Sequence, residues 1–146
     1  MQYLTITLLI GVISTINAVT YQVFLNITEI DATGYSCDYW SDCDIYLYAC
    51  IEKLEGYSFF QRTCEDSVDF GELTTDNNLW KGSITHTFIV DKFEKRTIMF
   101  VTVQDEDPGA NDNIKSFYKQ LYIEKPRYRL NFENPIKGSI ELTRIK

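Results

Sequence analysis

The sequence of 146 residues is poor in the side chains that catalysis most often uses. It has a single histidine, His86, and its four cysteines form no Cys-x-x-Cys pair. His86 lies in an alternating run and shares a face with Ile84 and Phe88, so we expect a structural histidine rather than a catalytic one. For carboxylate pairs such as Asp105 and Asp107, the sequence does not distinguish acid–base catalysis from metal binding or from a solvated acidic loop. The sequence therefore disfavours an enzyme, and a hydrolase that depends on His86 is the weakest alternative.

No apolar run reaches the roughly 20 residues that a transmembrane helix needs. The longest run lies at the start, where residues 4–13 are almost wholly apolar and residues 1–18 hold no charged side chain. A short apolar segment that ends in small and polar residues is typical of a secretory signal peptide. We therefore expect a signal peptide at 1–18, cleaved after Ala18, and a secreted, extracellular domain at 19–146.

Positive charge is scarce over most of the chain. Residues 19–112 carry 6 Lys and Arg against 18 Asp and Glu, whereas residues 113–146 carry 8 against 3. The formal net charge is −7 and the sequence pI is near 4.7. Because nucleic acid is a polyanion, this balance excludes it as an expected partner.

All four cysteines follow the predicted signal peptide: Cys37, Cys43, Cys50 and Cys64. In an oxidising export route an even count predicts two disulfides, and a zinc site would need more histidines than the sequence has. Four cysteines allow three pairings, and the sequence alone does not choose among them. Cys50 points away from the aliphatic face of its strand, toward a cover that Cys64 could supply. We therefore favour Cys50 with Cys64 and Cys37 with Cys43.

Alternation of apolar and polar residues dominates residues 19–146, as in strands with one packed face. The predicted strands are 21–27, 45–51, 57–62, 84–90, 97–104, 117–123, 128–132 and 139–143. Turn-forming residues separate them at 31–34, 75–78 and 107–110, and no segment shows a helical apolar stripe over several turns. The sequence predicts an all-β fold, an eight-stranded antiparallel sandwich.

The triplet Asn26-Ile27-Thr28 is a glycosylation sequon in a chain expected to be exported. Its occupancy requires the Asn26 side chain to face solvent. Acceptor triplets also arise by chance, so the sequence leaves occupancy open.

Two acidic loops offer oxygen ligands for a metal ion. An apolar strand runs into the segment 105–113, where Asp105 and Asp107 can turn toward one ion and Asp112 can return a third carboxylate. An earlier loop at 31–44 adds Asp38 and Asp44 among its acids. Calcium takes 6–8 oxygen ligands, so these loops would form a calcium site if they met at one end of the sandwich. The alternative is two solvated acidic loops, because turns favour Asp and Asn in any case.

The pattern Cys37-x5-Cys43-Asp44-Ile45-Tyr46-x3-Cys50-Ile51-Glu52-Lys53-x10-Cys64 resembles the N-terminal module of Delta- and Jagged-type Notch ligands. The resemblance covers roughly the whole of 19–146, because the strand and acidic loop at 98–112 are similar to that module as well. It implies a C2-like sandwich of eight strands whose loops at one end bind calcium and membrane lipid.

The same resemblance implies a set of ligands and of partners. The candidate calcium ligands are Asp38, Asp44, Asp105, Asp107 and Asp112. The implied partners are membrane lipid or the extracellular repeats of a receptor. In Notch ligands a receptor-binding domain and epidermal-growth-factor repeats follow this module, whereas this sequence ends at Lys146. We therefore expect a stand-alone binding module, a soluble modulator or co-ligand, with a secreted structural or defence-type protein as the alternative.

Overall fold

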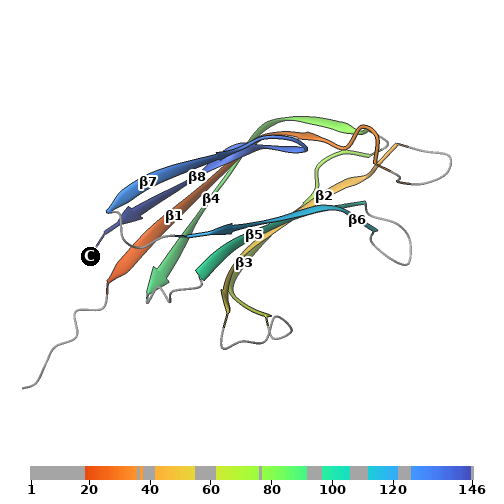
Figure 1. Ribbon diagram of the computed structural model, residues 1–146. Coiled ribbons are helices and arrows are strands. Elements are labelled where there is room, and N and C mark those ends of the chain that lie inside the picture. Colours follow the sequence, from red (N-terminus) through yellow and green to blue (C-terminus); the bar gives the residue numbers. More distant parts are fainter. Residues whose placement is uncertain are drawn as a thin grey trace, which may run out of the picture.

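The computed structural model describes residues 19–35, 37, 42–54, 62–75, 77–91, 97–105, 112–121 and 126–145. Within them the chain forms eight strands in two packed layers (Figure 1). The strands are β1 (Thr20–Asp31), β2 (Ile45–Leu54), β3 (Arg62–Glu72), β4 (Leu79–Asp91), β5 (Thr97–Asp105), β6 (Asp112–Gln120), β7 (Arg127–Phe132) and β8 (Ile136–Arg144). The predicted signal peptide at 1–18 lies outside the described residues, and the domain boundary at 19 stays a prediction. No helix in the described part of the chain is long and apolar enough to cross a membrane.

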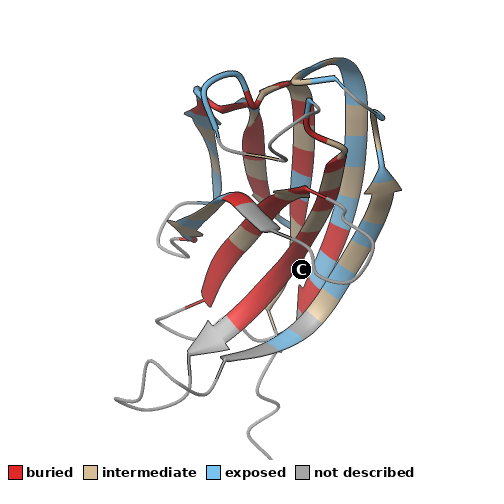
Figure 2. Cartoon of the chain, turned by 90° about the vertical axis from the view of Figure 1, so that its right-hand side faces the viewer, coloured by how far each residue is buried: buried red, intermediate tan, exposed pale blue. Residues whose placement is uncertain are grey.

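Each layer is a four-stranded antiparallel sheet. Sheet A has the order β4-β1-β8-β7 and sheet B the order β3-β2-β5-β6. The predicted class, an eight-stranded antiparallel β-sandwich, is confirmed. The central strands β1 and β2 follow the predicted alternation, with Leu25 and Leu47 fully buried between the sheets and Phe24 and Tyr46 on the outer faces. Figure 2 shows buried positions alternating with exposed ones along the strands.

Aromatic contacts join the two sheets along both lateral edges. Phe117 of β6 packs on Phe132 of β7 with ring centroids 4.6 Å apart. On the other edge, Phe70 of β3 meets His86 of β4 at 6.2 Å, and His86 packs edge-on against Phe88 at 4.5 Å. His86 is half-buried among aromatic rings, as expected of a structural histidine.

Six of the predicted strands coincide with observed ones, and the other two differ from the observed strands in their bounds. The structure has β3 at Arg62–Glu72, whereas the sequence predicts a strand at 57–62, of which 57–61 lie outside the described residues. Asp69 and Glu72 are exposed on this edge strand, so the apolar pattern is weak there. Likewise β6 runs over Asp112–Gln120 rather than 117–123, with Lys115 exposed on an edge strand.

The backbones of β1 and β8 approach closely next to a bulge in β1. The register of β1 shifts between Ile27 and Glu29 against both of its neighbours. Opposite Ile27, a side chain at Gly138 would collide with the Asn26 carbonyl oxygen and would lie 2.9 Å from the ring of Phe132. Gly138 is therefore required by close approach rather than by a special backbone angle.

The chain reversals gather at two opposite ends of the sandwich. Four connections lie at one end: β1–β2, β3–β4, β5–β6 and β7–β8. We call this the loop end. The first and last described strands meet at the other end, where the Ile145 N–H donates to the Thr20 carbonyl at 2.9 Å (Figure 1).

Candidate functional site

Asp105 is the buried carboxyl group at the centre of the loop end. It is the last residue of β5 and is only 3% exposed. Its Oδ1 accepts the Asp44 N–H at 2.7 Å, which fixes the residue that precedes β2 against the end of β5. A hydrogen bond from a backbone N–H to a carboxylate is charge-assisted and stronger than one between neutral groups.

The β3–β4 connection holds the same segment from its other side. Asn78 accepts the Cys43 N–H at 3.1 Å through Oδ1 and donates through Nδ2 to the Asp42 carboxylate. The Asn77 N–H donates to the Cys43 carbonyl at 3.1 Å, and Thr74 Oγ1 accepts the Ile45 N–H at 3.4 Å. Residues 42–45 are therefore clamped between β5 and the β3–β4 connection.

Sequence reasoning missed this second anchor. The sequence predicts only a turn at 75–78, and Thr74 carries no local signal at all. The hydrogen bond between Cys43 and Asn78 spans 35 positions, so only the folded topology brings the two residues together.

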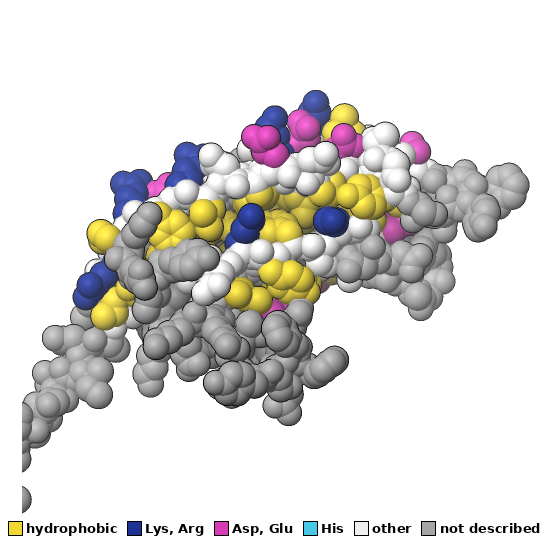
Figure 3. Space-filling model, viewed as in Figure 1, with side chains coloured by type: hydrophobic (Ala, Val, Ile, Leu, Met, Phe, Trp, Pro, Cys, Tyr) yellow, Lys and Arg dark blue, Asp and Glu magenta, His cyan; other side chains and the backbone are white. Residues whose placement is uncertain are grey.

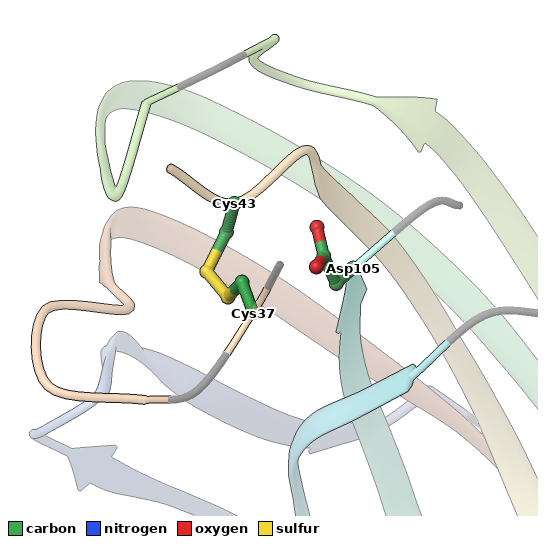
Figure 4. Close-up of side chains that lie close together, drawn as sticks. All are labelled: Cys37, Cys43 and Asp105. Atoms are coloured by element: carbon green, nitrogen blue, oxygen red, sulfur yellow. A yellow bond between two sulfur atoms is a disulfide. The ribbon is translucent and has the colours of Figure 1, made fainter. Parts of the chain in front are cut away.

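A disulfide packs beside Asp105 at the loop end (Figure 4). Cys37 and Cys43 are joined with their Cα atoms 5.3 Å apart, inside the usual range for a disulfide. One ligand atom from each of these cysteines and from Asp105 lie within 4.8 Å of one another. Bonded sulfur is not a thiolate, so this cluster is not a cysteine metal site. The disulfide instead packs beside the carboxyl group of Asp105 (Figure 4).

The five predicted ligands divide by where the structure places them. Asp44 and Asp105 are in contact, through the Asp44 backbone. Asp112 begins β6 and pairs with Asp105 across the ladder, which places its Cα beside the same site. Asp38 and Asp107 lie outside the described residues, as does the Asp112 side chain. The structure thus brings three of the five to one end of the sandwich, in two of the four connections at the loop end.

The second disulfide lies on the outer face of sheet B. Cys50 of β2 and Cys64 of β3 are joined with their Cα atoms 5.7 Å apart, and Tyr48 donates its hydroxyl to Cys64 Sγ at 3.4 Å. The pairs favoured from the sequence are thus the pairs at disulfide distance. Glu52 is 4% exposed and lies beside this disulfide, far along β2 from the loop end.

Asp31 is the last residue of β1, next to the loop end, and the pKa of its carboxyl group is lowered. Its Oδ1 accepts the Thr33 N–H at 2.9 Å, which forms the turn that leads into Gly34. Hydrogen bonding from the Thr33 side chain, then from its backbone, lowers the pKa of Asp31, and Lys81 adds a smaller effect in the same direction. The carboxylate is therefore held in its charged form.

Comparisons with known proteins address the fold. No protein-family model and no curated protein matches the sequence. A C2 domain protein from Ramazzottius varieornatus superposes with a TM-score of 0.56 at 19% identity, over 87% of this chain and 88% of that one. The chain has a C2-like fold. Human GIVD cytosolic phospholipase A2, solved with a fluorophosphonate inhibitor and terbium chloride, superposes with a TM-score of 0.61 at 15% identity.

The two likenesses differ in how much of the other protein they cover. The superposition on the phospholipase covers 87% of this chain but only 17% of the phospholipase chain. Identities this low show the fold alone and carry no activity or ligand with them. No particular family is shown.

Proposed function

We propose that this C2-like chain is an exported binding module that holds calcium at its loop end and docks there on a phospholipid surface. The observation that carries the proposal is the burial of Asp105, whose carboxylate lies where the β1–β2 and β5–β6 connections meet. A carboxylate taken out of water is costly unless charges or hydrogen bonds compensate it. A cation shared with neighbouring acids is one such compensation.

The donor set fits calcium in type. Calcium prefers carboxylate and carbonyl oxygens. Asp44 and Asp105 lie at the same end, and Asp112, whose Cα pairs with that of Asp105, would add a third carboxylate. The sulfurs beside Asp105 are bonded to each other and offer no competing thiolate for a soft metal. Asp105 would keep its hydrogen bond from Asp44 while it binds the ion. Asp38 and Asp107 complete the proposed set.

Bound calcium would supply the positive charge that the loop end lacks. Asp42, Asp44 and Asp105 give this end negative charge, which repels the phosphates of a lipid surface. An ion held by these residues reverses that local charge, because a bound divalent cation is often the largest charge in a site. Lipid binding should therefore depend on calcium.

Calcium titration of the oxidised protein, followed by calorimetry, tests the metal. Wild type should bind, and Asp105→Asn should bind at least ten-fold more weakly. The matched control is Asp66→Asn, which removes the same charge from β3, where Asp66 pairs with Ile51 away from the loop end. If Asp105→Asn binds calcium like wild type, the metal proposal fails.

Sedimentation with vesicles of anionic phospholipid tests the lipid contact separately. Wild type should pellet with vesicles in calcium and stay in the supernatant with a chelator. Equal pelleting in both conditions would contradict calcium-dependent docking, even if calcium itself binds.

The cysteine spacing supports a second candidate, contact with the extracellular repeats of a Notch-type receptor. What favours it is the pair of disulfides in the spacing that resembles the Notch-ligand module. Binding of the oxidised protein to immobilised receptor repeats tests it. The absence of measurable association would leave a secreted lipid-binding or structural module.

A further inference from the structure

We infer that Asn26 carries an N-linked oligosaccharide whose first sugar packs on the exposed ring of Phe24. Asn26 lies on the outer face of β1, the second strand of sheet A, and is half-buried. Its sequon, Asn26-Ile27-Thr28, is the only Asn-x-Ser/Thr triplet in the sequence. The inference rests on the export that is part of the proposed function.

Phe24 stands on the same outer face, two residues before the acceptor. Alternation along a strand places residues i and i+2 on one side, with Cα atoms about 7 Å apart. Phe24 is 37% exposed, whereas the inward residues Val23 and Leu25 are fully buried. An aromatic ring with an open side, at about the length of one sugar from the acceptor, offers an apolar surface to the carbohydrate.

On the β4 side, the neighbour of Asn26 leaves room for a sugar. Asn26 pairs with Thr85 on β4 and with Ser139 on β8, and both side chains are small. Phe24 pairs with Thr87 and Glu141. On β8, Ser139 is only 4% exposed and accepts a hydrogen bond from Arg129 Nη2 at 3.1 Å. On β4, Thr85 and Thr87 are small and exposed, so the open path between the acceptor and the ring lies over β4.

The chemistry uses the general donor of the export pathway, a lipid-linked oligosaccharide diphosphate. The bond between sugar C1 and the diphosphate oxygen breaks, and the lipid diphosphate leaves. A bond forms between C1 and Asn26 Nδ2, and that amide loses one proton, which the departing diphosphate or the solvent accepts. The Thr28 hydroxyl that completes the sequon donates to the Lys137 carbonyl at 3.2 Å in the folded chain.

The glycan would cover the middle of the outer face of sheet A. This face carries basic side chains, among them Lys81, Arg127, Arg129 and Lys137. Figure 3 shows Lys and Arg side chains along the sheet A side of the molecule. A covered sheet A leaves the loop end and sheet B for protein or lipid partners.

Expression of the full chain in eukaryotic secretory cells tests the modification. Protein from the medium should carry added mass, and enzymatic deglycosylation should remove that mass and convert Asn26 to Asp. Asn26→Gln and Thr28→Val should both lack the added mass. A chain that stays in the cytosol overturns export and glycosylation together. A secreted chain without added mass overturns glycosylation alone.

Thermal unfolding before and after deglycosylation tests the packing on Phe24. The glycan should raise the Tm of wild type by about 3 °C or more. It should raise the Tm of Phe24→Ser by less than half of that. The matched control is Ile89→Ser, because Ile89 is 51% exposed and pairs with Gln22, away from the acceptor. An equal rise in Phe24→Ser and wild type would overturn the packing.

Discussion

At the scale of single residues, Asp105 combines almost complete burial with a charge-bearing side chain. Its carboxylate positions the Asp44 backbone, so it contributes to the fold before any ion binds. A change at this position should therefore affect stability and calcium affinity to different degrees, depending on the replacement. A replacement that retains an oxygen acceptor should separate the loss of calcium affinity from the loss of stability.

We predict that Asp105→Ala lowers the free energy of unfolding in urea by about 1–3 kcal/mol, the usual cost of an unsatisfied buried donor. Asp105→Asn should lose less, because its amide oxygen still accepts the Asp44 N–H. Both variants should lose calcium affinity. If Asp105→Ala is as stable as wild type, the hydrogen bond to Asp44 does not hold β2 in place.

Asp31 gives a pH-dependent prediction. The folded chain lowers the pKa of Asp31, so folding favours the charged carboxylate, chiefly through its hydrogen bonds from Thr33. This stability is fully present above about pH 4, near the ordinary pKa of Asp, and is lost as the pH falls through the lowered folded value.

Thermal unfolding of wild type and Asp31→Asn between pH 2 and pH 7, as a rough span around the ordinary pKa of Asp, measures this effect. Wild type should be the more stable protein at neutral pH, and the gap should narrow below about pH 4. A gap that stays constant over this span would show that the Asp31 charge does not contribute.

At the scale of elements, the pairing of β1 with β8 depends on Gly138. We predict that Gly138→Ala costs about 1–3 kcal/mol, as overpacked sites do, because the added methyl meets the Asn26 carbonyl and the Phe132 ring. Thr87→Ala, on the exposed face of β4, is the control and should change stability little. Urea unfolding measures both, and a neutral Gly138→Ala would mean that the strands separate without cost.

The strand β3 shows where sequence patterns stop being informative. Strands with a neighbouring strand on both sides were predicted within a few residues. Buried residues alternate with less buried ones along β1 and β2, whereas β5 is buried at nearly every position. β3 has a neighbour only on one side, and two bulges interrupt its pairing with β2. Acidic residues are tolerated on an edge strand, and in the sequence they obscure the apolar pattern of the few inward residues such as Val68.

At the scale of the whole molecule, the two disulfides lie in different places and should have separable effects. The Cys37–Cys43 bridge closes a separation of 6 residues at the loop end, and Cys50–Cys64 closes one of 14 on sheet B. The chain-entropy estimate gives losses of about 2 and about 3 kcal/mol on their removal.

We therefore predict that the Cys37→Ser and Cys43→Ser double variant loses the smaller amount of stability but most of the calcium affinity, because its bridge packs beside Asp105. The Cys50→Ser and Cys64→Ser double variant should lose more stability and retain calcium binding. Urea unfolding and calcium calorimetry on both variants measure the two effects. Equal calcium affinities would show that the bridge does not support the site.

The sequence predicted the class of the fold and the middle of most strands, because burial on one face imposes a period of two on residues such as those of β1 and β2. It also indicated Asp44 and Asp105 as neighbours in one site. It did not indicate Asn78 or Thr74, since the clamp on residues 42–45 arises only when the β3–β4 connection folds over them. Sequence-local signals carry no information on such contacts.

The meeting of Thr20 with Ile145 determines how this domain can be attached to anything else. A tether, a solid support or a neighbouring domain joined at either side of 20–145 emerges from the pole opposite the loop end. Attachment at that pole leaves Asp105 and the rest of the loop end facing away from the point of attachment. An immobilised domain should therefore bind calcium with the same affinity whichever terminus anchors it.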